Sequence, residues 1–383
     1  MPVDLAEKIY YDVNVVNLDN SENRRPTRAV FNQSRSTPFL QDPSKYYLSI
    51  IRWTLDSSTL PIFVPEMSPK AGDGVVDPNT TAYSVTMSYN GFIIRSPMLF
   101  IPQDKSAEVP PPPASQPNGI QQNNGGYYNI YSTSYVIYLV NNCLKECFDK
   151  LVIESGDTLP TDHPPFLTFD VQTKIAVMNV PLDGFGINTV GGPIELYFNT
   201  LMAGLFSSFP YEINYISSFG RNFKFLVDTL GISTIAAYPP QAPSAEQYDV
   251  IQIFQENSTV ESWNPVSSLA VMSNTLGVVQ NIEGKPTIFY ENVILNGTGN
   301  NSVSSNLISD FVADNYRPSI IYVPSAEYRR IQLTGNSPLS NLDISLFWKD
   351  KIGNFNPFIL PPGGSATMKL LFELKQTQLE KVG

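Results

Sequence analysis

Side chains that commonly carry catalysis or hold metal ions are scarce in this sequence. His163 is the only histidine, within the string Thr-Asp-His-Pro-Pro, and no Gly-x-Ser-x-Gly nucleophile motif occurs. A multi-histidine metal site is therefore excluded, and a Ser-His-Asp or Cys-His pair would have to use this one residue. We predict a loop histidine without a catalytic role.

The two cysteines, Cys143 and Cys147, are four residues apart and share one face of an expected helix. Two thiolates supply half of a zinc site, and no second pair of ligands completes it. We therefore predict that both are buried as small apolar side chains and that the chain holds no metal.

The glycine-rich stretch 184–192 contains Gly184, Gly186, Gly191 and Gly192. Their spacing is not the Gly-x-Gly-x-x-Gly of a dinucleotide site, and no strand-to-helix turn is expected there. The pattern indicates a loop, and no cofactor is predicted.

Carboxylates remain as candidates for hydrolysis, because a glycosidase needs only two Asp or Glu side chains brought together by the fold. Glu256 and Glu261, or Glu327, can be nominated, but nothing in their spacing favours catalysis over solvated or ion-paired side chains. We predict no catalytic residue and no enzymatic activity.

A group of aromatic and charged residues is left that allows two interpretations. In the first, Trp348 fills a core, Lys349 and Asp350 shape the following turn, and Glu327 pairs with Arg329 or Arg330 within a sheet. In the second, these residues form a contact between subunits, where aromatic and arginine side chains tend to dominate. The candidate residues for such a contact are Glu327, Tyr328, Arg329, Arg330, Trp348, Lys349, Asp350 and Trp263.

The composition limits the class of protein. Charged residues make up 15% of the 383 residues, well below the roughly 25% of ordinary soluble domains, so other polar side chains and tyrosines must cover the surface. The net charge of −11 argues against binding to duplex nucleic acid, which needs clustered Lys and Arg. No apolar run approaches the about 18 residues of a membrane span, and no signal peptide or disulfide framework is visible. These features indicate a protein made and used in a reducing interior.

The C-terminal region has the periodicity of β-strands. Leu342, Ile344, Leu346 and Trp348 alternate with mostly polar neighbours, and the stretch 366–374 has a second apolar face of the same kind. A turn at 350–354 and a Pro-Pro-Gly-Gly string at 361–364 lie between them. This pattern predicts a β-sandwich.

Earlier parts of the chain add strands and one long helix. Strands are expected at 8–17, 46–55, 166–171, 174–180, 194–198, 222–228, 248–255, 268–273 and 287–295, with a hairpin at 83–95 around Asn90-Gly91. A helix is expected from Ser132 to Val152, capped by Thr133 or Ser134 and followed by Gly156, and a shorter one at 200–207.

Two proline-rich segments, at 110–113 and 238–243, bracket the helical region. They predict an insertion within a β-domain: residues 1–102 and 246–383 form one jelly roll, and 103–245 form an inserted α+β or β domain. In that arrangement the strand 8–17 is the neighbour of 366–375, and the strand 46–55 is the neighbour of 342–349.

Several strings in the last third are similar to a known family. Pro324-Ser-Ala-Glu-Tyr-Arg329, Pro338-Leu-Ser-Asn-Leu-Asp-Ile344, Trp348-Lys-Asp-Lys-Ile-Gly353 and Lys369-Leu-Leu-Phe372 resemble the closing segment of virophage minor capsid, or penton, proteins of the Sputnik type. The minor capsid proteins of Maverick/Polinton elements have a similar segment. Upstream, Gln255-Glu-Asn-Ser-Thr259 and Trp263-Asn-Pro265 are similar as well, and Tyr197-Phe-Asn199 is so more loosely.

The resemblance implies a mainly β protein with a single jelly-roll β-sandwich and an inserted upper domain. It implies homopentamers at the fivefold vertices of an icosahedral capsid, contact with a double jelly-roll major capsid protein, and a place in the virion after assembly in the host-cell cytoplasm. The insert would contact a host or a giant virus. The alternative from the residues alone is a lectin-like or fibre-like β-sandwich that binds carbohydrate or a receptor.

Overall fold

The structure is a computed structural model that describes most of the chain. The described residues are 6–18, 26–69, 77–105, 107–113, 121, 126–228, 231–236, 247–279, 287–290, 293–296, 306–312, 319–323 and 329–375. The chain divides into two units, one formed by Met1–Pro61 with Pro265–Gly383 and the other by Ile62–Asn264. Each unit is described by itself below.

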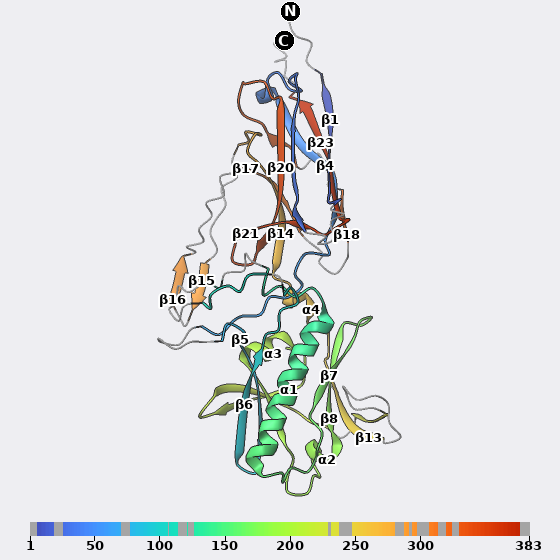
Figure 1. Cartoon of the computed structure of the whole chain (residues 1–383), viewed down its shortest axis with the longest axis vertical. Helices are drawn as coiled ribbons and strands as arrows, with labels where there is room; N and C mark the ends of the chain where they lie inside the picture. The colour runs from blue at the N-terminus through green and yellow to red at the C-terminus, as the bar shows by residue number, and fades with distance from the viewer. Residues whose placement is uncertain are drawn as a thin grey trace, which may run out of the picture. The chain divides into compact units, whose positions relative to one another are not determined.

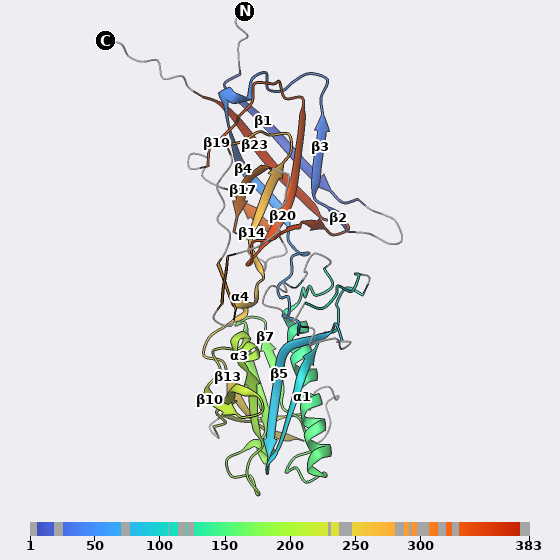
Figure 2. The same ribbon diagram turned by 90° about the vertical axis from the view of Figure 1, so that its left-hand side faces the viewer.

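The first unit is a sandwich of two antiparallel sheets, which face each other in Figure 1 and Figure 2. One sheet contains, in spatial order, β1 (Lys8–Val16), β23 (Ser365–Leu374), β4 (Tyr46–Asp56) and β18 (Ser319–Tyr322), with β19 (Ile331–Gln332) also on β4. The other contains β17 (Asn306–Phe311), β14 (Val266–Ser273), β20 (Asn341–Asp350) and β21 (Phe355–Pro357), with β3 (Val30–Ser34) also on β20. Short additions to this unit are the pairs β2 (Thr27–Arg28) with β22 (Ile359–Leu360) and β15 (Thr287–Tyr290) with β16 (Val293–Asn296), and the 3-10 turn Pro43–Lys45.

The pairing of the eight main strands defines a jelly roll. In chain order these strands are β1, β3, β4, β14, β17, β18, β20 and β23. The first pairs with the last, β3 with β20, β4 with β18, and β14 with β17. A long hairpin rolled into a sandwich has this nested pattern, so the expected fold class is confirmed. The second unit is inserted between β4 and β14.

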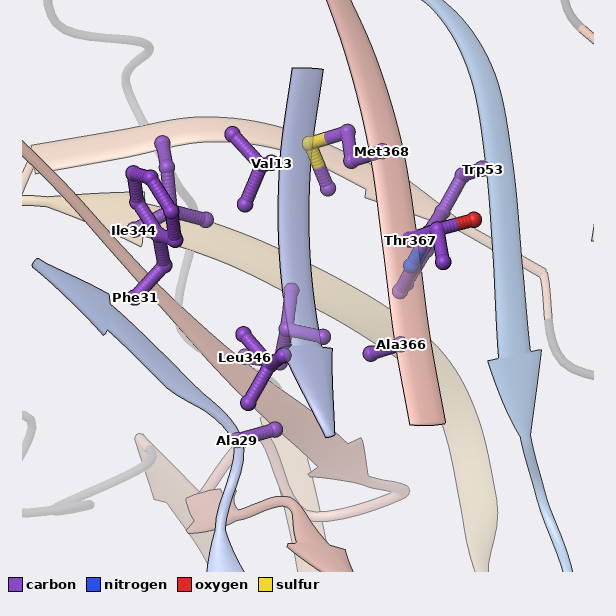
Figure 3. Close-up of a pocket in the computed structure, with 10 residues that line it drawn as sticks. Val13, Ala29, Phe31, Trp53, Ile344, Leu346, Ala366, Thr367 and Met368 are labelled. Atoms are coloured by element: carbon purple, nitrogen blue, oxygen red, sulfur yellow. The ribbon is translucent and has the colours of Figure 1, made fainter. Parts of the chain in front are cut away.

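The apolar faces of both sheets close on one core. Trp53 of β4, Ile344 and Leu346 of β20, and Met368 of β23 are all buried in it. Figure 3 shows these side chains between the sheets. The gap that they line has a volume of only ≈ 10 Å³. That volume is at the lower limit for one water molecule, so the core is closely packed.

The inserted unit has two sheets and one long helix. Its first sheet contains β10 (Tyr211–Ile216), β11 (Gly220–Phe225), β9 (Glu195–Asn199), β5 (Thr80–Tyr89) and β6 (Phe92–Leu99). Its second sheet contains β12 (Ile232–Ile235), β13 (Tyr248–Phe254), β8 (Ile175–Pro181) and β7 (Phe166–Asp170). Its helices are α1 (Thr133–Ser155), α2 (Leu182–Phe185), α3 (Thr200–Leu205) and α4 (Val260–Trp263).

Helix α1 packs on the β5–β6 hairpin (Figure 1) through its apolar face. Cys143 and Cys147 are buried there, and their thiols lie 3.3 Å and 3.4 Å from the carbonyl oxygens of Ser96 and Ile94. Burial is the main reason that the pKa of both thiols is raised, that of Cys147 to about 12. Both are free cysteines in a packed interface, as the sequence predicts.

Local sequence signals are well matched by the structure. Asn90 and Gly91 have φ of 48° and 87° and join β5 to β6, as a type I′ turn requires. Helix α1 ends at the left-handed Gly156, which follows it as predicted. The predicted cap was wrong, because the N-cap residue is Ser132, which makes no side-chain cap bond, and Thr133 and Ser134 lie inside the helix. The predicted proximity of the first and last strands is confirmed by the β1–β23 pair.

The expected pairing of the strands 46–55 and 342–349 is wrong. The strand Tyr46–Asp56 pairs with β23, β18 and β19, whereas the strand Asn341–Asp350 pairs with β14, β3 and β21. The strands 46–55 and 342–349 therefore face each other across the core from opposite sheets. They are not hydrogen-bonded neighbours.

The unit boundaries also differ from the proline-rich segments used to predict them. Residues before 103 already belong to the inserted unit, because Phe63 bridges Ile130 and the β5–β6 hairpin lies under α1. After residue 245, β13 pairs with β8 and β12 of the same unit. The insert therefore extends over 62–264 and not 103–245.

Candidate subunit interface

Two of the predicted contact residues are core tryptophans. Trp348 on β20 is buried in the jelly-roll core, opposite Leu269 of β14. Trp263 on α4 is buried in the inserted unit, where its Nε1 donates to the carbonyl of Leu205 at 2.7 Å and its ring meets Phe206 edge-on at 5.3 Å. Neither indole is available for a contact between subunits. The core interpretation of Trp348 is confirmed.

Lys349 and Asp350 shape the turn after β20. The buried Asp350 carboxylate accepts hydrogen bonds from the backbone N–H groups of Ile352 and Asn354 at 2.9 Å and 2.8 Å, and from the Asn354 amide at 2.9 Å. Lys349 lies over the ring of Phe355 at 5.5 Å, and partial burial lowers its pKa. These side chains fix a loop.

Arg330 lies on the outer face of the first sheet. Its guanidinium pairs with Glu373 of β23 at 2.9 Å and lies over the ring of Tyr47 on β4. Lys8 of β1 also reaches Glu373, at 3.5 Å. The partner of Arg330 is thus Glu373, which sequence reasoning did not nominate. Glu327 and Tyr328 lie outside the described residues.

Arg329 is the predicted residue that occupies an edge of the sandwich. Its guanidinium lies over the rings of Phe311 on β17 and Tyr322 on β18, at 5.2 Å and 5.4 Å, and donates to the carbonyl of Asp310 at 2.9 Å. The rings of Phe311 and Tyr322 meet at 4.4 Å. Arg329 is therefore held in place while remaining exposed.

This edge is one of two flanks of the sandwich. The β17/β18 flank consists of β17, β18, Val312, Val323 and Arg329, and each of its strands pairs on one side only within the described residues. Val312, Ile321 and Val323 are 83%, 71% and 70% exposed. Exposed edges with apolar side chains are surfaces that proteins usually cover.

The opposite flank, the β1/β3 flank, consists of β1, β3 and Leu18. Tyr11 of β1 meets Phe31 of β3 edge-on at 6.2 Å, which places the two strands on the same side. Tyr10, Val16 and Leu18 are 55%, 49% and 74% exposed. One sandwich thus has an open, partly apolar edge on each side.

Most of the β17/β18 flank was missed by sequence reasoning. Residues 319–323 read Ser-Ile-Ile-Tyr-Val, a β-branched and aromatic run that indicates a strand. The run is short and its alternation is weak, so it did not stand out beside the longer strands of the C-terminal region.

Other kinds of site are not evident in the described part of the chain. No three His, Cys, Asp or Glu side chains gather there as a metal site would require. No helix among the described residues is long and apolar enough to cross a membrane.

The fold defines a class of protein. The first unit is a jelly roll, an architecture that viral capsid proteins and lectins share. The sequence decides between them, because residues 9–374 match the family of the Sputnik minor capsid protein V18/19. The chain belongs to this family.

Two Sputnik virophage proteins are similar in sequence. The structural protein V19 is 30% identical over 197 residues, which cover 48% of this chain and 83% of V19. The uncharacterized protein V18 is 27% identical over 155 residues, which cover 40% of this chain and 90% of V18.

Two solved structures are similar in fold. A chain of the Sputnik virophage, from the 3.5 Å cryo-EM structure, matches with a TM-score of 0.74 and 26% identity over 97% of this chain and 98% of that chain. The mavirus penton protein matches in fold, with a TM-score of 0.59 and 16% identity over 96% of this chain and all of its own. The chain is therefore a structural, minor capsid protein of the virophage type, a component of the virion. The lectin-like alternative is not supported, and a structural family implies a role other than catalysis.

Proposed function

We propose that this protein forms homopentamers at the fivefold vertices of an icosahedral capsid. In each ring the β17/β18 flank of one copy meets the β1/β3 flank of the next copy. Such a contact joins two different surfaces, and when it is repeated by a rotation that closes, it forms a ring. The number five comes from the family resemblance. The observation that carries the proposal concerns both flanks of one sandwich: within the described residues their strands pair on one side only and carry exposed apolar side chains.

The side chains on the β17/β18 flank suit an interface. Arg329 and Tyr322 are of the types that dominate binding energy, and the packing of Arg329 over two rings lowers the entropy it would lose on binding. Ile321 and Val323 offer apolar surface next to them. On the opposite flank Tyr10, with the Lys369 ammonium 5.6 Å from its ring centroid, offers an aromatic counterpart.

A mixing experiment tests the contact between unlike flanks. The variant Ile321→Asp places a charge on the β17/β18 flank, and Tyr10→Asp places one on the β1/β3 flank. Each variant alone is expected to sediment as a monomer of 42.5 kDa. In a mixture, the intact β1/β3 flank of Ile321→Asp can meet the intact β17/β18 flank of Tyr10→Asp. The two variants are therefore expected to form a dimer of 2 × 42.5 = 85.0 kDa. Val171→Asp, at an equally exposed position of the inserted unit (72%), is the control and should assemble as the wild type does.

Either of two outcomes contradicts the proposal. Pentamers formed by Ile321→Asp would show that this flank is not in the ring contact. Monomers in the mixture, under conditions in which the wild type forms rings, would show that the contact does not join these two flanks.

We propose further partners in line with the family resemblance. The perimeter of the ring contacts a double jelly-roll major capsid protein, and assembly takes place in the host-cell cytoplasm. The inserted unit is the part presented to a host or giant-virus surface. Co-expression with the major capsid protein tests the first point, because the Val171→Asp control should enter shells and Ile321→Asp should be left out of them.

A further inference from the structure

An open pocket lies at one end of the inserted unit. It is lined by Tyr89 at the end of β5, by the segment after α1, by α2 and the loop that follows it, and by Ile232 of β12. Its volume is ≈ 760 Å³, within the about 300–1,000 Å³ typical of ligand pockets. Nothing in the family assignment accounts for it.

The glycine-rich loop 184–192 forms one wall of this pocket, and close packing fixes its path. A Cβ on Gly184 would overlap the side chain of Thr161 at 2.2 Å. Gly191 has a φ of +87°, and a Cβ there would lie 2.9 Å from the Tyr89 hydroxyl. Larger residues do not fit at these two positions, so the glycines give the pocket a defined shape.

Two hydrogen-bond acceptors line the pocket without a partner. Tyr89 is 7% exposed, and its hydroxyl makes no hydrogen bond within the described residues. Asp183, in the first turn of α2, is exposed, and its carboxylate has no ion pair or hydrogen bond there. A tyrosine with a buried ring usually places its hydroxyl where a partner can reach it, and in Tyr89 that place is the pocket.

The charges along the surrounding chain are all of one sign. No lysine or arginine lies within four residues of any residue that lines the pocket. Five carboxylates lie within that distance: Glu154, Asp157, Asp162, Asp183 and Asp228. On the neighbouring strands Lys224 of β11 is paired with Glu195 of β9, which accepts a hydrogen bond from Ser88 next to Tyr89, so the lysine charge is offset there. The excess of carboxylates along the lining segments favours a cation over phosphate, sulfate or an acidic sugar.

The remaining wall is apolar and exposed. Leu182, Val190 and Ile232 line the pocket, and the last two are 91% and 51% exposed. Apolar surface beside a carboxylate matches the two parts of a lysine or arginine side chain, which has an apolar stem and a charged head.

We propose that this pocket binds an arginine or lysine side chain, carried by an exposed segment of a partner protein with apolar residues next to it. The Asp183 carboxylate accepts hydrogen bonds from the cationic head, which the planar guanidinium of arginine can donate in pairs. The Tyr89 hydroxyl accepts a further hydrogen bond from the head. The stem and the neighbouring apolar residues contact Leu182, Val190 and Ile232. This site is separate from the flanks proposed for the ring.

The test uses the full chain and two fluorescent peptides that differ only in charge. The probes are acetyl-Ala-Leu-Arg-Leu-Ala-amide and the same peptide with citrulline, a neutral analogue of nearly the same shape, in place of arginine. Binding is followed by fluorescence anisotropy at low salt and again at high salt. The variants are Asp183→Asn and Tyr89→Phe, and Asp149→Asn is the control that removes one exposed carboxylate of α1 elsewhere in the unit.

The arginine peptide is expected to bind saturably, and the citrulline peptide at least about tenfold more weakly, because the charge-assisted bonds are lost. Asp183→Asn should weaken binding of the arginine peptide by a similar factor, Tyr89→Phe by less, and Asp149→Asn by little. Equal binding of the two peptides, an equal effect of the Asp183 and Asp149 substitutions, or no saturation up to about 1 mM peptide would overturn the proposal. The sedimentation mass of the same samples reports ring formation independently, so failure at this site and failure of the ring proposal are distinguishable.

Discussion

The two units cover their apolar sheet faces in different ways. In the jelly roll, sheet packs on sheet, and within the described residues this leaves the strands of the two flanks (β17 and β18, β1 and β3) paired on one side only. In the inserted unit, α1 covers the β5–β6 hairpin, and the notable surface is a pocket. The difference agrees with the two proposals, because flanks with unpaired strand edges suit repeated contacts between copies and a pocket suits one side chain of another partner.

The two motif tryptophans show that the units have separate cores. Trp348 packs between the sheets of the jelly roll, and Trp263 packs in the aromatic cluster of the insert. Both were candidates for a subunit contact, yet each stabilises its own unit. A tryptophan in a string that resembles a family can thus lie within a core, while the proposed contact surface uses less distinctive residues.

Substitution of a core tryptophan should have the largest effect on stability. Trp348→Ala removes an indole from the sandwich and is expected to cost about 3–5 kcal/mol of unfolding free energy. Hydrogen exchange should become faster in β14, β20 and β23 and stay unchanged in α1 and β5, since the cores are separate. An unchanged melting temperature would contradict the core position of Trp348. Faster hydrogen exchange over both units alike would contradict separate cores.

A buried carboxylate of the jelly roll should have the next largest effect. Asp343 accepts hydrogen bonds from Thr275 Oγ1 at 2.6 Å, Ser273 Oγ at 2.7 Å and the backbone N–H of Asn274 at 2.9 Å. Asp343→Asn places a donor among these donors and is expected to cost about 1.5–3 kcal/mol, measured by chemical denaturation.

The Asp343 carboxylate should also make the free energy of unfolding depend on pH. Burial alone would raise the pKa of Asp343, but the hydrogen bonds from Thr275, Asn274 and Ser273 outweigh it, so the pKa is lower than in the unfolded chain. Its contribution to stability is therefore present above the unfolded value of about 3.9 and is lost as the pH falls through the folded value. Asp343→Asn should flatten the acid limb of a plot of stability against pH, and an equally steep limb would exclude this role.

Arg329 should matter more for assembly than for stability. Arg329→Ala removes an exposed guanidinium from two rings, which is expected to cost about 0.5–1 kcal/mol in the isolated chain. In the ring the same change removes a flank residue, so the pentamer should dissociate at higher protein concentration than the wild type. A dissociation concentration equal to that of the wild type would remove Arg329 from the proposed contact.

Arg330→Met should have the smallest effect. The ion pair with Glu373 is partly exposed, with 47% and 22% of the two side chains accessible, and surface pairs contribute about 0–1 kcal/mol. Neither the melting temperature nor the sedimentation mass should change appreciably. A loss of pentamers would extend the interface from the flank onto the outer face of the first sheet.

Local signals in the sequence predicted local structure well. The Asn90-Gly91 turn, the helix around Cys143 and Cys147, and the turn held by Asp350 depend on residues close together in the chain. The alternation in 342–348 and 366–374 predicted the buried faces of β20 and β23.

Features that depend on distant residues were not predictable in the same way. Alternation shows which face of a strand is buried but not which strand pairs with it, so 46–55 was assigned to the wrong neighbour. The proline-rich segment at 110–113 lies within the inserted unit and was taken as its boundary. The flanks depend on which strands end at the edge of a sheet, and the pocket depends on β5, α2 and β12 meeting at one end of a unit.

The most direct test of the central proposal is the sedimentation mass of the full chain in neutral buffer, alone and with the major capsid protein. Five copies of 42.5 kDa give 5 × 42.5 = 212.5 kDa, and a species of that mass is expected. A protein that stays at 42.5 kDa alone and also fails to form five-membered rings in assembled shells would contradict the account.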